Sequence, residues 1–336
     1  MRNTAQVTFF LPDEPRLEEL KSLDPDRDWR LLSRGQAAWV LQTYLRLARA
    51  GLPVGLSGRL PAEGLVVFHA RDKREAAHRL PRLAATALVA VRGDRCEVYA
   101  ADFEILQNGR WADGRRRFFL PHWPQPGLVP RDPARGARIG RAAFLGLQVN
   151  LDAGFRSGAW RDFLRGRGIE WAADAVEPVE SETGGVGARW NDYSRVDLVV
   201  AVRDLRGRGH TGKPATKLCN AWLAGVPAIL GPEYAYRELR RRDLDYIEVR
   251  SLEEARAAVI RLQEEPALYR AMVENGLRRA EEFTVQAVTR RWADLLYETL
   301  PRAMATDAFR RSRRVPARLR SLWRRLARLA ALRPAR

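Results

Sequence analysis

The sequence predicts an α/β protein with two Rossmann-like domains whose parallel sheets face a cleft. Three observations predict this fold. Short apolar runs that suit buried strands alternate with helical patterns in both halves of the chain, which is typical of parallel sheets covered by helices. A proline-rich stretch separates the two halves, and further helical patterns close the chain. The length of 336 residues also suits two domains.

The first half of the chain contains four apolar runs and one clear helical pattern. The helical pattern covers about residues 36–50 and stops at Gly51. Five prolines then occur between Pro121 and Gly136, and proline at this density interrupts both helices and strands. We therefore expect the crossing between the domains here. The apolar runs predict strands at Val7–Leu11, Leu65–Ala70, Ala87–Val91 and Phe118–Leu120.

The second half repeats the alternation. Ser251 and Glu254 form a capping box that predicts a helix to about residue 265. Further helices are expected at 159–167, from about Pro214 or Thr216 to Gly225, at Pro266–Glu282 and at Thr284–Leu300, and a surface loop at 177–187. Strands are expected at 142–146, Val196–Val202, Pro227–Leu230 and Tyr246–Val249.

These patterns predict four parts of the chain. Residues 1–125 would form a first Rossmann-like domain and residues 126–285 a second. Residues 286–306 would form a helix that crosses back towards the first domain, and residues 307–336 a basic amphipathic tail.

Composition excludes several classes of protein. No apolar run reaches the length of about 18 residues that a spanning helix needs. The N-terminal apolar patch "VTFFL" is too short for a signal peptide, so we expect a cytoplasmic protein. Cys96 and Cys219 are the only cysteines and neither has a second thiol or a histidine nearby in sequence, which argues against a disulfide framework and a zinc site.

The net charge of +18 is concentrated at the end of the chain. Residues 308–336 contain eleven arginines and no acidic residue. This pattern predicts a basic amphipathic helix that lies on an anionic membrane surface. The tail could also bind nucleic acid or pack against its own domain. An apolar stripe that includes a Trp favours the membrane over nucleic acid. The stripe consists of Leu319, Leu322, Trp323, Leu326, Leu329 and Ala330.

A strongly basic loop follows the strand at Val196–Val202. The helix after this loop begins at a proline, and the free N–H groups and positive dipole of a helix start favour anions. A solvated basic loop before an ordinary packed helix would carry the same residues. The position of the loop at the carboxyl end of a strand, and Gly207, Gly209 and Gly212, favour an anion site. The basic residues are Arg203, Arg206, Arg208, His210, Lys213 and Lys217, against Asp204 alone.

The stretch "PATKLCNAWLAGVPAIL" at 214–230 resembles the donor-binding signature of GT-B glycosyltransferases, P-[ST]-K-L-x-E-x-[ML]-A-x-G-x-P, of the group 1 or family 4 type. The resemblance implies that Thr216 and Lys217 contact the diphosphate of a nucleotide-sugar. Asn220 stands where the family has an acid that holds the ribose, which is a departure. Gly225 and Pro227 match structural positions of the signature.

The resemblance implies further donor contacts. Glu233 and Tyr234 lie where the family approaches the sugar or the base. Gly146 lies in the loop after the first strand of the second domain, which approaches the phosphates in the family, although a structural turn would also use a glycine. Together with Arg203, His210 and Lys213, it completes the expected diphosphate site.

Residues of the first domain are candidates for the acceptor side. His69 and Asp72 follow a strand, where a base could deprotonate an acceptor hydroxyl, although a histidine there can be merely hydrogen-bonded. Gly35 and Gln36, at the start of the first helix, could reach the cleft. His122 and Trp123 lie at the junction of the domains, where the indole could stack on a ligand or pack in the hinge.

The expected activity is that of a hexosyltransferase-type glycosyltransferase. It would move a sugar from a nucleotide-diphosphate sugar to an acceptor hydroxyl, with cell-surface glycan or glycolipid synthesis as the expected setting. Lys217 would stabilise the leaving diphosphate, and we expect no metal and no cofactor beyond the donor. The alternatives are a non-catalytic nucleotide-sugar or anion-binding module, and a basic nucleic-acid-binding protein.

Overall fold

The computed structural model divides the chain into two compact units. Unit 1 comprises Met1–Pro25, Arg34–Pro121 and Val288–Arg336, and unit 2 comprises Asp26–Ser33 and His122–Ala287. The structure describes residues 6–32, 35–73, 85–93, 95–173, 190–206, 210, 212–315 and 317–331. The loop expected at 177–187, Gly207, Arg208 and Gly209 lie outside the described residues.

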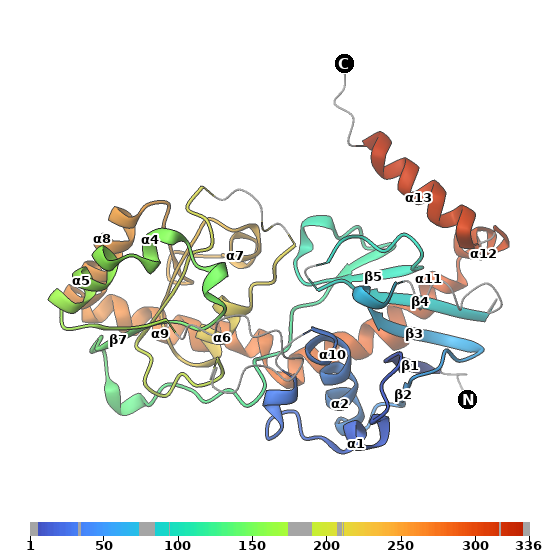
Figure 1. Cartoon of the computed structure of the whole chain (residues 1–336), viewed down its shortest axis with the longest axis horizontal. Coiled ribbons are helices and arrows are strands. Elements are labelled where there is room, and N and C mark those ends of the chain that lie inside the picture. Colours follow the sequence, from blue (N-terminus) through green and yellow to red (C-terminus); the bar gives the residue numbers. More distant parts are fainter. Residues whose placement is uncertain are drawn as a thin grey trace. The chain divides into compact units, whose positions relative to one another are not determined.

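Each unit contains one sheet, and every described strand pair in both sheets is parallel, as the sequence predicts (Figure 1). The sheet of unit 1 has the order β2-β1-β3-β4-β5-β6. Its strands are β1 (Val7–Phe10), β2 (Val54–Ser57), β3 (Glu63–His69), β4 (Ala85–Val91), β5 (Phe103–Leu106) and β6 (Arg117–Phe119).

The sheet of unit 2 has the order β11-β10-β9-β7-β8, with β9 at its centre. Because β9 is flanked by β10 and β7, the chain segments that leave these three strands emerge side by side at one edge of the sheet. Its strands are β7 (Arg141–Phe144), β8 (Glu170–Ala173), β9 (Leu198–Ala201), β10 (Ala228–Leu230) and β11 (Ile247–Glu248).

The helices of unit 1 pack aromatic side chains against the sheet. Tyr44 and Trp292 both contact the ring of Phe9 on β1, with centroids 6.2 and 6.4 Å away. Chain segments about 250 residues apart thus share one core. The helical segments are α1 (Leu17–Ser22), the π-helical η2 (Ala37–Leu41), α2 (Gln42–Arg49), η3 (Ala70–Asp72), η5 (Gly109–Trp111), α10 (Val285–Asp294), which begins in unit 2, the π-helical η9 (Leu295–Thr299), α11 (Leu300–Ala305), α12 (Asp307–Arg314) and α13 (Ala317–Ala331).

The helices of unit 2 surround a larger core. In α6 (Thr216–Leu223), the buried Trp222 contacts Phe283, with ring centroids 5.6 Å apart, and α6 packs against α9 (Pro266–Ala280). Ser251 caps α8 (Leu252–Glu264) by accepting from the Glu254 N–H, as predicted, whereas the Glu254 carboxylate accepts from the Arg250 N–H and not from that of Ser251. The remaining helical segments are η1 (Trp29–Leu32), η6 (Pro133–Arg135), η7 (Gln148–Asn150), α4 (Ala153–Arg156), α5 (Gly158–Gly166), α7 (Tyr234–Leu239) and η8 (Glu281–Phe283).

The structure differs from the sequence prediction at several elements. β2, β5 and β8 were not expected. The single helix expected at Thr284–Leu300 is interrupted by η9, because Pro301 lacks the N–H that would continue the α-helical hydrogen bonds. Among the described residues, no helix combines the length and the hydropathy needed to cross a membrane.

Candidate functional site

The candidate site lies at the carboxyl ends of β7, β9 and β10 in unit 2. Leu145 and Gly146 follow β7, Arg203 follows β9, and Glu233 follows β10. The three strands are neighbours in a parallel sheet, so these residues emerge at the same edge. In open parallel sheets this is the edge at which ligands bind.

Helix α6 begins at this edge without a capping side chain. Ala215 occupies the N-cap position and makes no side-chain hydrogen bond to the helix. Among the described residues, the N–H groups of Thr216 and Lys217 have no acceptor. The start of α6 therefore offers free donors and the positive end of a helix dipole, which together favour a bound anion.

The Lys217 side chain turns towards the end of β7. Its ammonium group donates a hydrogen bond to the Leu145 carbonyl oxygen and lies 5.3 Å from the centroid of the Phe144 ring. A Cβ atom at Gly146 would come within 2.7 Å of Lys217 Nζ. Glycine is thus the residue that leaves room for the ammonium group, and the structure brings these two predicted residues together.

Arg203 and Glu233 form the second part of the cluster. They make an ion pair, and Arg203 Nη1 lies 3.3 Å from the Tyr236 hydroxyl. The second carboxylate oxygen of Glu233 is buried and has no hydrogen-bond partner among the described residues. A buried polar atom without a partner is costly, and a bound ligand would supply one.

The charges of the cluster do not balance. Burial, together with the positive charge of Arg203, lowers the pKa of Lys217 to about 7, and the negative charge of Glu233 offsets only part of this effect. Two cationic side chains therefore share one carboxylate in a poorly solvated place. An added anion would offset this excess positive charge.

The predicted loop residues lie outside this cluster of contacts. His210 is exposed and has a positive φ of 53°. Its carbonyl oxygen accepts a hydrogen bond of 3.0 Å from the Lys213 N–H. The contacts that define the cluster do not include the side chains of these two residues, and their roles stay predictions.

Asn220 is engaged by neighbouring protein groups. Its side chain is 4% exposed, its Oδ1 accepts a 3.1 Å hydrogen bond from the Gln125 N–H, and the Tyr193 hydroxyl is hydrogen-bonded to the same amide. The ribose role stays a prediction, and a ribose would have to compete with these contacts. Tyr234, the first residue of α7, is 38% exposed.

The predicted acceptor-side residues form a separate group in unit 1. Gln36 Nε2 donates a 2.5 Å hydrogen bond to Asp72 Oδ2. His69, at the end of β3, is 1% exposed and accepts a 3.3 Å hydrogen bond at Nδ1 from the Arg71 N–H. Gly35 has a positive φ of 54° at the start of the helical segment. The structure thus joins Gln36 to Asp72 and buries the ring of His69.

His122 and Trp123 are the first residues of the long segment of unit 2. His122 Nδ1 lies 2.7 Å from the Trp123 carbonyl oxygen, and the Trp123 side chain is buried. The indole is therefore packed, so a ligand could stack on it only after a rearrangement.

Sequence reasoning missed three groups of the site. The Leu145 carbonyl belongs to the backbone, so no residue type could indicate it. Phe144 lies in the apolar strand expected at 142–146, and the residue type of Tyr236 gave no indication of its contact with Arg203. Among the described residues, no three His, Cys, Asp or Glu side chains come together as a metal site.

Comparisons with known proteins agree with this architecture. The structure resembles sucrose-phosphate synthase from Thermosynechococcus elongatus, with a TM-score of 0.55, 13% identity, and coverage of 89% of this chain and 100% of that one. It also resembles Anabaena HepE in complex with UDP and glucose, with a TM-score of 0.51, 10% identity and coverage of 87% and 99%.

An α1,3-fucosyltransferase is similar as well, with a TM-score of 0.50, 10% identity, and coverage of 88% of this chain and 92% of that one. No protein-family model matches the sequence, and no curated protein matches it either. At these identities the likeness establishes the fold, and the chain has the GT-B fold that the signature at 214–230 predicts.

Proposed function

We propose that this protein is a glycosyltransferase that moves a sugar from a nucleotide-diphosphate sugar to an acceptor hydroxyl. The observation that carries the proposal is the cluster of Lys217, Arg203 and Glu233 beside the uncapped start of α6. Its excess positive charge suits a diphosphate. The neighbouring free oxygen of Glu233 would accept a hydrogen bond from a sugar hydroxyl.

Transfer requires the bond between the anomeric carbon and the diphosphate oxygen to break while the acceptor oxygen bonds to that carbon. The departing diphosphate keeps the electron pair and gains negative charge. In our proposal, the Lys217 ammonium and the N–H groups at the start of α6 stabilise this charge. Such electrostatic stabilisation of a developing charge is usually the largest single contribution to catalysis. Arg203, Gly146, Thr216, His210 and Lys213 complete the diphosphate site.

The acceptor hydroxyl must also lose a proton. We propose His69 or Asp72 as the base, with Gly35, Gln36, His122 and Trp123 on the acceptor side. The 1% exposure of His69 requires that its surroundings open before an acceptor reaches the ring. A nucleotide-sugar-binding module without transferase activity is the alternative, and the burial of His69 favours it.

The remaining features of the proposal concern the setting. We propose a cytoplasmic enzyme of cell-surface glycan or glycolipid synthesis. It needs no cofactor, because cationic side chains, rather than a metal ion, neutralise the negative charge of the diphosphate. Full transfer in the presence of EDTA would support the metal-free reaction, and activity that depends on added Mg²⁺ or Mn²⁺ would contradict it.

The central experiment is a thermal-shift screen of nucleoside diphosphates and their sugars, followed by transfer assays against a glycan panel. A ligand that binds only the folded protein raises its melting temperature. Lys217→Ala should lose both the donor-induced shift and the turnover while the protein stays folded. The matched control is Lys21→Ala, which removes a lysine that pairs with Glu18 on α1.

The outcomes separate the two candidate functions. Donor binding with transfer supports the enzyme, and donor binding with neither hydrolysis nor transfer supports the binding module. Unchanged turnover in folded Lys217→Ala would refute the diphosphate site.

A further inference from the structure

The arginine-rich end of the chain is docked on unit 1. The Phe309 ring of α12 stacks on the Phe103 ring of β5, with centroids 5.5 Å apart and planes within 1° of parallel. Arg313, also on α12, donates hydrogen bonds of 2.9 Å to Asp102 Oδ2 and 2.8 Å to the Thr86 carbonyl. These contacts fix α12 against the amino ends of β4 and β5.

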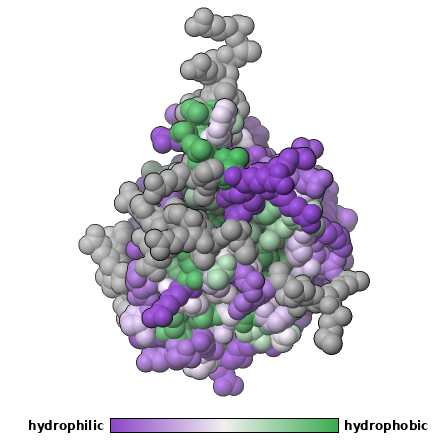
Figure 2. Space-filling model, turned by 90° about the vertical axis from the view of Figure 1, so that its right-hand side faces the viewer, coloured by the Kyte–Doolittle hydropathy of each residue, from purple (hydrophilic) through white to green (hydrophobic). Residues whose placement is uncertain are grey.

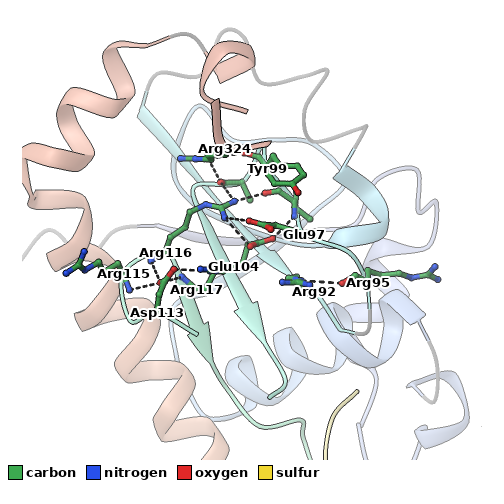
Figure 3. A network of polar contacts seen from close by, with 12 residues as sticks. Arg92, Arg95, Glu97, Tyr99, Glu104, Asp113, Arg115, Arg116, Arg117 and Arg324 are labelled. Carbon is green, nitrogen blue, oxygen red and sulfur yellow. Dashed lines mark hydrogen bonds and ion pairs between the residues drawn. The ribbon is translucent and has the colours of Figure 1, made fainter. Parts of the chain in front are cut away.

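Helix α13 is held by two further arginines. Arg324 Nη1 donates to the carbonyl oxygens of Tyr99 and Ala101, at 3.0 and 2.6 Å (Figure 3). Arg320 donates to the carbonyls of Ser312 and Val315, and its Nη2 lies 3.5 Å from Asp102 Oδ1. Because these guanidinium groups are hydrogen-bonded to protein groups, we do not expect Arg313, Arg320 and Arg324 to bind a partner.

The site that receives Arg324 is itself an ionic network. Arg116 donates to the carbonyls of Val98 and Ala101 and bridges Glu97 and the fully buried Glu104 (Figure 3). Arg324 and Arg116 thus share the Ala101 carbonyl. The contacts of Arg116 that hold this surface involve no residue of α13.

The opposite side of α13 presents apolar side chains to solvent. These residues are spaced by three and four positions, so they form one stripe, and Arg320 and Arg324 point away from it. Figure 2 shows green apolar surface beside purple hydrophilic surface near the top of the molecule. The stripe consists of Leu319, Leu322, Trp323 and Leu326, which are 47, 51, 70 and 50% exposed.

Four described arginines of the two helices are exposed to solvent. They are Arg310, Arg311 and Arg314 on α12 and Arg325 on α13. The docked α12–α13 pair therefore carries both an apolar stripe and exposed cationic side chains.

We propose that the docked α12–α13 pair is a preassembled binding surface for an anionic lipid membrane. The apolar stripe inserts among the acyl chains, and the four exposed arginines meet the anionic headgroups. Arg313, Arg320 and Arg324 are positioning residues that orient this surface and do not touch lipid. Every residue involved lies in unit 1, so the proposal is independent of the donor site.

The charge pattern favours lipid over other partners. A nucleic acid would engage the arginines but would leave the apolar stripe in water. A second copy of the chain would cover the stripe but would bring the exposed arginines of both copies close together, where they repel. An anionic membrane satisfies both parts of the surface.

The test compares two variants that remove the same charge. One replaces the exposed Arg310, Arg311 and Arg325 by Gln, and the other replaces the docked Arg313, Arg320 and Arg324 by Gln. Binding to phosphatidylcholine vesicles that contain phosphatidylglycerol is measured by co-sedimentation, and the melting temperature by calorimetry.

The exposed triple variant should lose about a hundredfold in vesicle affinity, roughly fivefold per arginine, and keep its melting temperature. The docked triple variant should melt at a lower temperature. If it does not fold, Arg324→Gln alone provides the milder comparison. Equal losses of vesicle affinity in both triple variants with unchanged melting temperatures would show that the tail is a free tether, and would overturn the proposal.

A second pair of variants tests the apolar stripe. Leu322→Ser combined with Trp323→Ser should weaken vesicle binding at least tenfold. Leu277→Ser is the matched control, since Leu277 is 48% exposed on α9 in unit 2 and should not affect binding. Two results would overturn the lipid assignment: tighter binding of duplex DNA than of vesicles, or a dimer in sedimentation that the double serine variant dissociates.

Discussion

Two of the buried ionic clusters of unit 2, one around Asp197 and one around Lys217, differ in one respect. Around Asp197, every charge has its partners: both carboxylate oxygens accept hydrogen bonds of 2.6–3.0 Å from Arg131, Arg135, Gly140 N–H and Arg141 N–H. Around Lys217, two cations share Glu233, one of whose oxygens has no partner among the described residues. One cluster is complete and the other is not.

Position in the sheet gives this difference its meaning. Asp197 precedes β9 and holds the amino end of the strand, whereas Arg203 follows the same strand at its carboxyl end. A complete cluster at the amino end stabilises the fold, and we propose that the incomplete one at the carboxyl end, the edge at which ligands bind in such sheets, receives the donor. The pKa values agree. Burial alone would raise the pKa of Asp197, but hydrogen bonds from Arg135, Gly140 and Arg131 outweigh it and lower the pKa.

The largest expected effect comes from breaking the complete cluster. Asp197→Asn leaves two arginines without a buried counter-charge, so the free energy of unfolding should fall by about 3–5 kcal/mol. Chemical denaturation measures this loss. Asp162→Asn is the matched control, because Asp162 pairs with Arg165 on an exposed surface and should change stability by less than about 1 kcal/mol. Donor affinity of folded Asp197→Asn should be normal, and a weak effect on stability would contradict the structural role.

The next largest effect is that of Lys217→Met, which should raise the stability of the protein but lower its affinity for the donor. Lys217→Met removes an ammonium group from a poorly solvated place, so the ligand-free protein at pH 6 should become more stable. We expect a gain of only about 1–2 kcal/mol, because the lysine side chain is half-buried and keeps some contact with water. The same change should weaken nucleoside diphosphate binding by about 1.5–3 kcal/mol, the usual contribution of a charged hydrogen bond. Melting temperatures with and without ligand measure both. A variant that loses stability and keeps affinity would make Lys217 a structural residue.

The fold was largely predictable because its strands are short apolar runs. β1, β3, β4, β9 and β10 all overlap the expected segments. β5 was missed because Glu104 interrupts its apolar pattern, yet this carboxylate is fully buried and paired with Arg116, which lies twelve residues further along the chain. The packing of the strands decides which arginine meets this acid, so the residue types alone do not indicate the pair.

The site was predictable only in part, because residue types indicate single groups and not the contacts between them. The type and position of Lys217 indicated an anion site, and Gly146 indicated a close approach of another group. The sequence did not indicate that these two residues meet each other, or that Asn220 is occupied by Gln125 and Tyr193. Such contacts depend on tertiary packing, which residue types and local spacing do not determine.

The pH dependence tests the incomplete cluster more finely. With a pKa of about 7, Lys217 is charged below neutral pH and neutral above it in the ligand-free protein. A diphosphate favours the charged form, so donor affinity should fall by up to about tenfold per pH unit above pH 7, until the pKa of the bound state is reached. Calorimetric titration from pH 6 to 9 measures this fall in donor affinity. The Lys217→Met variant should lack the part of the fall that the titration of Lys217 causes.

The same group affects the stability of the ligand-free protein. Its folded-state pKa of about 7 lies below the ordinary lysine value of 10.5, so the unfolded state binds more protons between these two values. The contribution of Lys217 to the free energy of unfolding is therefore least favourable below pH 7 and improves as the pH rises from 7 to 10.5. The stability gain of Lys217→Met should shrink over this range, and a gain that grows instead would contradict the assigned pKa.

The smallest effect concerns the space beside the ammonium group. In Gly146→Ala, the new Cβ would lie 2.7 Å from Lys217 Nζ, so the flexible end of the lysine must move away from the Leu145 carbonyl. Because only a mobile group has to shift, stability should change by less than about 1 kcal/mol, while donor affinity should fall about three- to tenfold. Gly158→Ala on α5, where a Cβ meets nothing within 4 Å, provides the control for the loss of backbone freedom. Equal donor affinities in the two variants would mean that the position of the Lys217 ammonium does not matter for binding, and the contrast between the two clusters would then have no functional meaning.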